Sequence, residues 1–213
     1  MSVNVGMPRV VEWHGRAVES GIWKEPVDHR VAVRGVNLDG DAQADRRLHG
    51  GPDKAVCTYA VEDYAWWTDR LGRELDPATF GENLTVEGLD LGAMVIGTRW
   101  RIADTVLEVS QPRMPCFKLG MRMGDADFVD EFGEAARFGA YLRIVTEGSV
   151  GTGDEIVVDG ADERGGRGVA VHELGSSLHH PSVTLLERLV ADPAIPVSWQ
   201  DWAQRRLDRH ADS

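Results

Sequence analysis

The chain has 213 residues with a formal net charge of −12, and 42% of its residues are hydrophobic. This length suits one barrel-type domain with or without a small appendage, and the acidic balance argues against direct binding to a nucleic acid backbone. No apolar run approaches the roughly 20 residues of a membrane-spanning helix and no signal-peptide pattern opens the chain, so we expect a cytoplasmic protein without membrane contact.

Short strands dominate the predicted secondary structure of the first 160 residues. Seven β-rich runs are separated by turn residues and lie at positions 30–33, 55–59, 84–86, 100–103, 106–110, 141–145 and 155–158. Short strands at regular spacing are typical of closed or nearly closed barrels. The sequence therefore predicts a mostly β fold with a barrel domain over residues 1–160.

Two helices are expected to interrupt the barrel. The first covers residues 61–71, where apolar residues recur at three- and four-residue steps, and Gly72 follows as a stop. The second covers residues 125–136 and places Phe128 and Phe132 on one face. Both patterns predict amphipathic helices that bury one side against the barrel.

The composition changes after the barrel. Residues 161–182 are rich in glycine, charged residues and histidine, which predicts a linker or mobile loop. Residues 183–213 then contain two helical patterns, the first with Thr184 and Glu187 at the spacing of a capping box and the second around Trp199. A short helical appendage, too small to fold alone, is therefore expected at the C-terminus.

Cys116 is the residue to which we assign the chemistry. It follows a predicted strand, lies between Arg113 and Lys118, and sits in a loop stiffened by two prolines. A thiolate is the nucleophilic and metal-binding form of cysteine, and nearby positive charge lowers the pKa that controls it. The alternative is a thiol that only packs, which is the role we expect for Cys57 in its apolar strand.

A second candidate segment joins a polar run to a strand and contains the paired glycines Gly50 and Gly51. Glycines let the backbone approach a ligand closely, so their N–H groups, with Arg47 and Lys54 nearby, suit an anion site. His49 adds a group that titrates near neutral pH and can relay protons. A tight turn that needs no ligand is the alternative.

Asn83 marks a third candidate, the segment 80–84, directly before a predicted strand. Its amide can offer a donor and an acceptor to a polar ligand. The alternative is a turn that only caps the end of the strand.

Common cofactor and catalytic motifs are absent from the sequence. The seven histidines lack zinc-site spacing, and there is no P-loop, no Gly-x-Gly-x-x-Gly between a strand and a helix, and no Gly-x-Ser-x-Gly. Two cysteines cannot supply the usual four thiolates of an iron–sulfur cluster. A redox reaction in this chain would therefore need electrons from another protein.

Taken together and in this order, the candidate segments resemble the MOSC domain family, and most closely its YiiM-like branch. The matching segments are Asp39-Gly40-Asp41 with Gln43-Ala44-Asp45, His49-Gly50-Gly51-Pro52-Asp53-Lys54-Ala55, Phe80-Gly81-Glu82-Asn83-Leu84, and Gln111-Pro112-Arg113 with Pro115-Cys116 and Lys118-Leu119. The upstream residues 20–27 look like the N-terminal strand region of the family. The resemblance covers about residues 15–158.

This resemblance implies a MOSC-type β-barrel with a few helices and a short C-terminal helical appendage. In the family, the cysteine that Cys116 matches is thought to ligate molybdenum of a pterin cofactor or to carry sulfur. YiiM-like members are associated with reduction of N-hydroxylated compounds, including base analogues. The resemblance therefore implies an oxidoreductase with a detoxification role, independent of pyridoxal phosphate.

On this basis the expected cofactor is the molybdenum cofactor (molybdopterin), with Cys116 as its metal ligand and Cys116 and His49 as catalytic residues. The expected cofactor-binding residues are Arg47, Gly50, Gly51, Lys54, Asn83, Arg113 and Lys118. The expected partners are a small N-hydroxylated substrate and an external electron-donor protein, and an oligomer is compatible with the sequence.

Two other functions stay open on the sequence alone. A sulfur-carrier or cofactor-handling protein would bear a persulfide on the same cysteine. A non-catalytic pterin-binding module would use the pocket without turnover.

Overall fold

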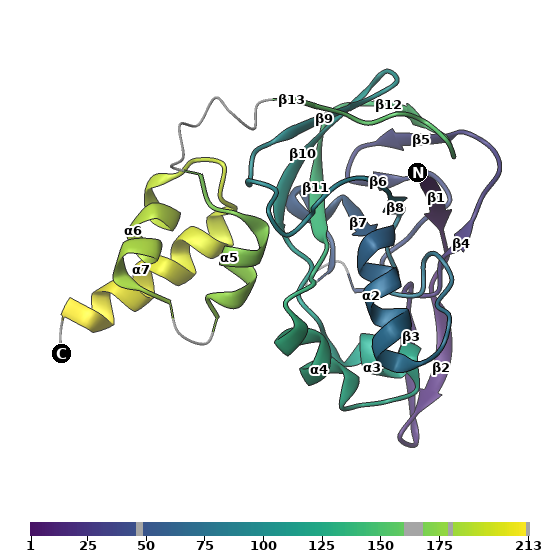
Figure 1. Ribbon diagram of the computed structural model, residues 1–213, viewed down its shortest axis with the longest axis horizontal. Helices are drawn as coiled ribbons and strands as arrows, with labels where there is room; N and C mark the ends of the chain where they lie inside the picture. The colour runs from purple at the N-terminus through teal and green to yellow at the C-terminus, as the bar shows by residue number, and fades with distance from the viewer. Residues whose placement is uncertain (46–48, 160–167, 179–180, 212–213) are drawn as a thin grey trace.

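The computed structural model describes residues 1–45, 49–159, 168–178 and 181–211. The strands build a body that contains the N-terminus, and helices near the C-terminus gather in a unit at its side (Figure 1). The large sheet of this body curls into a half-barrel. The mostly β, barrel-type fold expected from the sequence is therefore confirmed.

The strands fall into three sheets. Their bounds are β1 Ser2–Val5, β2 Arg9–Trp13, β3 Arg16–Ser20, β4 Glu25–Pro26, β5 Val31–Arg34, β6 Asn37–Leu38, β7 Val56–Ala60, β8 Leu84–Val86, β9 Arg99–Ile102, β10 Thr105–Pro112, β11 Ala140–Thr146, β12 Gly148–Val150 and β13 Val157–Asp159. The eight-stranded sheet has the order β13-β9-β10-β11-β7-β8-β1-β4, beside the three-stranded β12-β5-β6 and the hairpin β2-β3. Only β7 and β8 pair in parallel among these strands.

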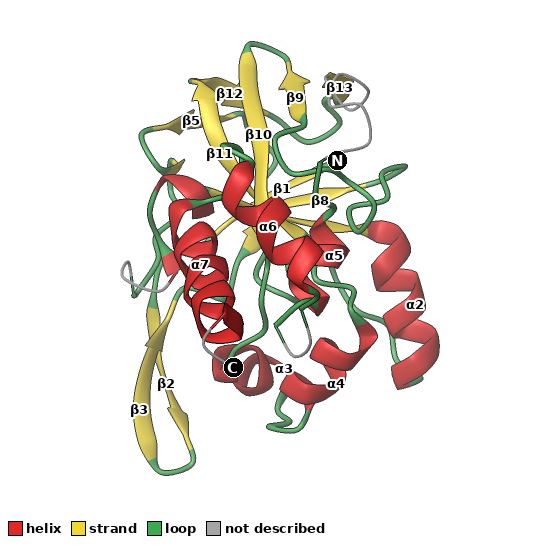
Figure 2. Cartoon of the chain, turned by 90° about the vertical axis from the view of Figure 1, so that its left-hand side faces the viewer, coloured by secondary structure: helices red, strands yellow, loops and turns green. Residues whose placement is uncertain are grey.

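The helices cover one end and one side of the half-barrel (Figure 2). Their bounds are η1 Pro52–Lys54, α2 Val61–Leu71, α3 Phe117–Met123, α4 Phe128–Ala135, α5 Val171–Ser176, α6 Val183–Ala191 and α7 Val197–Ala211. The helix predicted over residues 61–71 has these bounds in the structure, and Gly72 ends it in the left-handed conformation at φ 63°. The second helix, predicted over residues 125–136, is shorter in the structure, where α4 begins at Phe128 and ends at Ala135.

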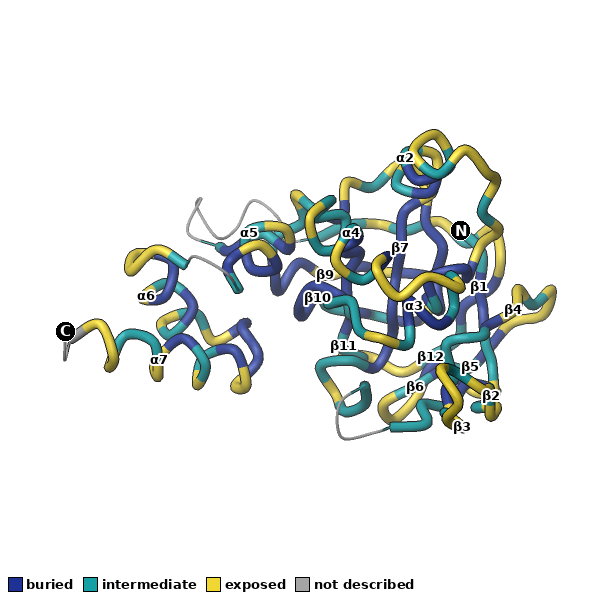
Figure 3. The backbone as a smooth tube through the Cα atoms, turned by 90° about the horizontal axis from the view of Figure 1, so that it is seen from below, coloured by how far each residue is buried: buried dark blue, intermediate teal, exposed yellow. Residues whose placement is uncertain are grey.

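Two hydrophobic clusters hold these elements together. The larger fills the half-barrel around Trp100 and Leu107 and continues into the C-terminal helices through Leu186, Leu189 and Trp199. The smaller one is aromatic and lies between α2, α4 and β7; its members include Tyr59, Tyr64, Trp67, Phe80, Phe128, Phe132 and Phe138. In Figure 3 the buried parts of the tube lie mainly along strands inside the body and recur in the helices near the C-terminus. Shared burial makes the C-terminal helices part of one core with the barrel.

The segment predicted to be a linker or mobile loop, residues 161–182, contains a helix. Helix α5 buries Val171 and Leu174, and Ala170 forms an isolated bridge with Val95. The sequence analysis did not predict this helix, because the polar composition of the segment hid two buried apolar residues one turn apart. Residues 160–167 and 179–180 lie outside the described part of the chain.

We define the C-terminal helical unit as α5, α6 and α7. The predicted capping box at Thr184 and Glu187 is wrong, since α6 begins after Ser182, whose hydroxyl accepts the N–H of Leu185 at 3.2 Å. The true cap lies two residues earlier than predicted. The helix itself was correctly expected.

The hairpin β2–β3 was missed by the sequence analysis. It extends away from the body (Figure 2), and most of its residues are exposed or only partly buried. Without a buried face, its sequence lacks the alternation that identifies a strand. Separately, none of the helices in the described residues is long and apolar enough to cross a membrane.

Candidate functional site

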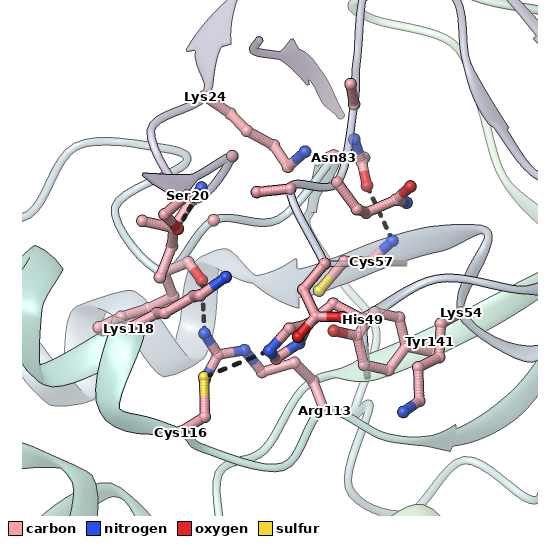
Figure 4. A pocket seen from close by; sticks show the side chains of 18 of the residues that line it. Ser20, Lys24, His49, Lys54, Cys57, Asn83, Arg113, Cys116, Lys118 and Tyr141 are labelled. Atoms are coloured by element: carbon pink, nitrogen blue, oxygen red, sulfur yellow. Dashed lines mark hydrogen bonds between the residues drawn. The ribbon is translucent and has the colours of Figure 1, made fainter. Parts of the chain in front are cut away.

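A pocket of about 620 Å³, counting its open mouth, collects the segments that the sequence analysis singled out (Figure 4). Its lining comes from the end of β3, the loop after β6, the η1 segment, the loop before β8, and the loop between β10 and α3. The predicted residues His49, Lys54, Asn83, Arg113, Cys116 and Lys118 all line it. Loops that are far apart in the chain therefore meet at one place.

Cys116 is held at the start of α3, where it is the N-cap residue with extended backbone angles. Its carbonyl accepts the N–H of Leu119 at 2.8 Å. Its Sγ atom lies 3.8 Å from Nε2 of His49, and Figure 4 shows the two side chains facing each other. The thiol is only partly buried, so it faces the pocket.

The surroundings of Cys116 favour the thiolate. Burial by itself would raise the pKa of this thiol, but the hydrogen bond to His49, the charge of Arg113 and the N–H of Lys118 together lower it to about 7. A cysteine with such a pKa is about half ionised at neutral pH. Cys116 is therefore available as a nucleophile or as a metal ligand.

Arg113 is a buried cation that lacks an acidic partner among the described residues. Its side chain is 6% exposed, its Nη2 donates to the carbonyl of Phe80 at 3.0 Å, and its guanidinium lies 5.5 Å from the ring centre of Phe132. Its Nη1 atom is buried and has no hydrogen-bond partner in this part of the chain. Because leaving a charged donor buried and unpaired is costly, the site is suited to an anion that would satisfy it.

The lysines of the chain are concentrated in this pocket. The sequence has 23 Lys and Arg residues, and its only three lysines, Lys24, Lys54 and Lys118, all line the pocket. Burial lowers the pKa of Lys54, and the negative charges of Asp53 and Cys116 offset part of that effect. Lys54, Lys118 and Arg113 make a cationic hollow in an acidic protein.

Lys24 and Asp41 form a buried ion pair at the wall of the pocket that the sequence analysis did not predict. The lysine Nζ contacts the Asp41 carboxylate, which also accepts the N–H of Gly6 at 3.0 Å. Both residues are about nine-tenths buried. The resembling segments contained both residues, but nothing in their spacing indicated that they meet.

A buried carboxylate fixes the loop before β8. Glu82 is fully buried and accepts hydrogen bonds from the Tyr64 hydroxyl at 2.8 Å, the Thr85 hydroxyl at 2.8 Å and the N–H of Ala78 at 2.7 Å. Burial raises the pKa of Glu82, and these donors offset part of the rise. The Tyr64 hydroxyl also accepts the N–H of Phe80 at 3.2 Å. Glu82 thereby holds in place the Phe80 carbonyl to which Arg113 donates.

The remaining predicted residues lie as follows. The side chain of Asn83 accepts the N–H of Cys57 at 3.0 Å and donates to the carbonyl of Asn4 at 3.3 Å, so its amide is engaged within the fold. Gly50 and Gly51 do not line the pocket, although Gly51 adopts a positive φ of 95° at the start of η1. Arg47 lies outside the described residues.

Two further residues line the pocket: Cys57, for which the sequence analysis expected a packing role, and Tyr141, which it did not single out. Cys57 lines it but is 7% exposed, and burial raises the pKa of its thiol to about 12. Tyr141 on β11 also lines it, and burial raises the pKa of its phenol, which stays protonated at neutral pH. Its place on the strand gave no sequence signal, because a tyrosine in a strand usually packs.

Comparison with known proteins agrees with this architecture. The sequence model of the MOSC domain matches residues 45–157. The chain is 37% identical over 211 residues to the uncharacterized protein YflK of Bacillus subtilis, covering 98% of this chain and 94% of YflK. It is 32% identical over 146 residues to a protein named reductase from Gibberella moniliformis, of which it covers 26%.

The fold also matches a solved structure. The crystal structure of YiiM from Geobacillus stearothermophilus superposes with a TM-score of 0.78 at 29% identity, and the match covers 97% of both chains. The fold therefore places this chain in the class of proteins with a curled sheet, and its pocket, with Cys116, lies at the loops of that sheet. The chain belongs to the MOSC domain family, in its YiiM-like branch.

The residues of the pocket fit a molybdenum cofactor. The unpartnered Nη1 of Arg113 and the ammonium groups of Lys54 and Lys118 suit a phosphate, and the Cys116 thiolate is a soft ligand for a metal such as molybdenum. Within the described residues, no group of three or more His, Cys, Asp and Glu side chains is arranged to hold a metal ion. Cys116 would accordingly be a single protein ligand to a metal carried by an organic cofactor.

Proposed function

We propose that this chain is a molybdenum-cofactor-binding reductase of N-hydroxylated compounds, with Cys116 as the ligand to the metal. The observation that carries the proposal is that one pocket holds the Cys116 thiol, 3.8 Å from Nε2 of His49, and a buried cation whose Nη1 has no partner in the described structure. Membership of the MOSC family and a relative named reductase support the coarser part of the proposal, an oxidoreductase activity. When bound, the cofactor supplies the redox couple for a two-electron reduction.

The binding role falls to the cations. Arg113 donates to the Phe80 carbonyl, lines the pocket and keeps an Nη1 atom without a partner in the described structure. Lys54 and Lys118 add compact positive charges at the same hollow. Cationic groups in a partly desolvated pocket hold a phosphate more strongly than groups at an open surface.

The proton role falls to His49. Reduction of a hydroxylamine breaks one N–O bond, consumes two electrons and two protons, and yields an amine and water. An external electron-donor protein would supply the electrons. The His49 ring is 3.8 Å from the Cys116 thiol, so it can deliver a proton to a leaving hydroxyl next to that sulfur.

The proposal is tested with two cysteine variants made in a host that produces the molybdenum cofactor. Cys116→Ser is expected to lose bound molybdenum and the reduction of an N-hydroxylated purine driven by a chemical electron donor, whereas Cys57→Ser keeps both. Metal content and turnover are measured on the purified proteins. Retention of molybdenum and activity in Cys116→Ser would refute the proposal.

The same preparation tests the sulfur-carrier alternative. Intact mass spectrometry of the wild-type protein would show one added sulfur atom on Cys116 if a persulfide were its working form. We expect no such adduct, and bound molybdenum in its place.

A further inference from the structure

The C-terminal helical unit is joined to the candidate site by a first polar bridge. The indole N–H of Trp199 on α7 donates to Oε1 of Gln111 on β10 at 2.8 Å, and both residues are more than nine-tenths buried. The other end of the Gln111 amide donates through Nε2 to the carbonyl of Asp53 at 3.1 Å. An indole can only donate and a carbonyl can only accept, so these two partners fix the orientation of the amide.

A second bridge runs in parallel. Arg143 on β11 donates through Nη2 to the carbonyl of Ala194, in the turn between α6 and α7, at 2.9 Å. Its Nε contacts the carboxylate of Asp53, and its Nη1 donates to Glu108 at 2.9 Å. Helical unit and sheet are thus joined by a buried amide and by a partly buried guanidinium.

Both bridges end on the same residue of the η1 segment. Gln111 holds the carbonyl of Asp53, Arg143 holds its carboxylate, and the Ser110 hydroxyl is a further donor to the carbonyl at 2.6 Å. The next residue in the chain is Lys54, which lines the pocket. Gln111 is also only two residues before Arg113 on the same stretch of backbone.

We propose that the C-terminal helical unit positions Lys54 in the candidate site through Trp199, Gln111 and Arg143. Gln111 and Arg143 bind Asp53 directly, and Trp199 acts on it by way of Gln111. The inference rests on the proposed function only in assigning an anion-binding role to Lys54. It gives the appended helices a role beyond completing the hydrophobic core. Trp199, Gln111 and Arg143 are positioning residues, since they act on the pocket through Asp53 and do not line it.

A physical reason connects the bridge to the state of Lys54. Without the indole donor, Oε1 of Gln111 is left buried and unsatisfied, which favours rotation of the amide and weakens its hold on Asp53. When the η1 segment is loosened, water reaches the Lys54 ammonium group more fully. Burial lowers the pKa of Lys54, so greater hydration raises it toward the ordinary lysine value.

The lysine content of the chain makes this measurable. With only three lysines in the sequence, protein labelled with ¹³C at the lysine ε position gives three side-chain NMR signals, all from residues of the pocket. Mutation of each lysine in turn assigns them. The signal of Lys24, which is held by Asp41, serves as an internal reference within the same spectrum.

The test compares Trp199→Phe and Gln111→Met with Trp202→Phe. Trp202 is on the same helix and packs edge-on against Trp199, but it does not line the pocket. We expect both bridge variants to raise the Lys54 pKa and shift its signal while leaving Lys24 unchanged, and Trp202→Phe to alter neither. Thermal melting of all three proteins reports the purely structural effect.

Two results would overturn the inference. One is a Lys54 signal and pKa identical to wild type in both folded bridge variants. The other is an equal change in Trp202→Phe, which would make the effect one of general packing. Because the experiment needs neither molybdenum nor turnover, it can succeed or fail independently of the proposed reductase activity.

Discussion

Cys116 and Cys57 line the same pocket, yet they differ widely in acidity. The Cys116 thiol has a pKa of about 7, because a histidine, a buried arginine and a backbone N–H outweigh its burial. The Cys57 thiol has a pKa of about 12, because burial in strand β7 dominates over the same arginine. Cys116 lies at the start of helix α3, in the loop after β10, where its thiol meets polar partners, and this position makes it the thiol that can react.

The largest expected effect is the difference in reactivity between the two thiols. At pH 7, pKa values of about 7 and 12 leave about half of Cys116 but only about one Cys57 in 10⁵ as thiolate. The more basic thiolate of Cys57 is intrinsically more nucleophilic, so the ratio of reaction rates is smaller than the ratio of thiolate populations by a factor of roughly 10². Alkylation with iodoacetamide, mapped by peptide mass spectrometry, should therefore favour Cys116 by at least about 10²-fold. Equal labelling of both sites would remove the distinction.

The next effect comes from His49. Its hydrogen bond is the strongest of the influences that lower the pKa of Cys116. His49→Leu should raise that pKa and reduce the alkylation rate of Cys116 at pH 7 by about tenfold. The exposed His29 provides a matched control, and His29→Leu should leave the rate unchanged. An unchanged rate in His49→Leu would show that the ring does not stabilise the thiolate.

Replacement of Arg113 should have a smaller effect on the thiol. Arg113→Met removes the charge that lowers the pKa of Cys116, so alkylation at pH 7 should slow by roughly threefold to fivefold. Arg113→Lys keeps the charge and should lie between this variant and wild type. If Cys116 is alkylated at the same reduced rate in Arg113→Met and Arg113→Lys, the hydrogen bond from Arg113 to Phe80 controls the reactivity of the thiol and the charge of Arg113 does not.

Glu82 is among the main influences on the pKa of Cys57 but not on that of Cys116, and its replacement has the smallest expected effect on thiol reactivity. Its negative charge is one of the groups that raise the pKa of Cys57, after burial. Glu82→Gln should lower that pKa slightly and leave Cys57 protonated at neutral pH. It should also destabilise the fold by about 1–3 kcal/mol, because the Ala78 N–H and the Tyr64 hydroxyl lose a charged acceptor. Chemical denaturation measures this loss, and an unchanged stability would contradict the role given to Glu82.

The parts of the fold with a periodic buried face were predictable from sequence. Helix α2 was predicted over its full length because its apolar residues recur at helical steps and Gly72 stops it. Helix α5 and the hairpin β2–β3 were not predicted. The first has only two buried apolar residues within a polar stretch, and the second is largely exposed, so neither carries the pattern of a buried face.

The candidate site was predictable in its residue types but not in its contacts. Cys116 was selected because its thiol lies between Arg113 and Lys118 in the sequence, and His49 because it adds an imidazole to a glycine-rich segment; the structure brings Cys116, His49 and Arg113 together. The pairing of Lys24 with Asp41 and the engagement of Asn83 by Cys57 and Asn4 depend on how loops fold over one another. A single sequence contains no local signal for such contacts between distant segments.

The ionisation of Cys116 is tested most directly by its alkylation rate as a function of pH. The rate is followed by mass spectrometry on the Cys57→Ser protein, so that a single thiol reports. A thiol with a lowered pKa gains reactivity at lower pH than a free one, and we expect a midpoint at about pH 7. A midpoint at about 8.5 or above, the value of an unperturbed cysteine, would contradict it.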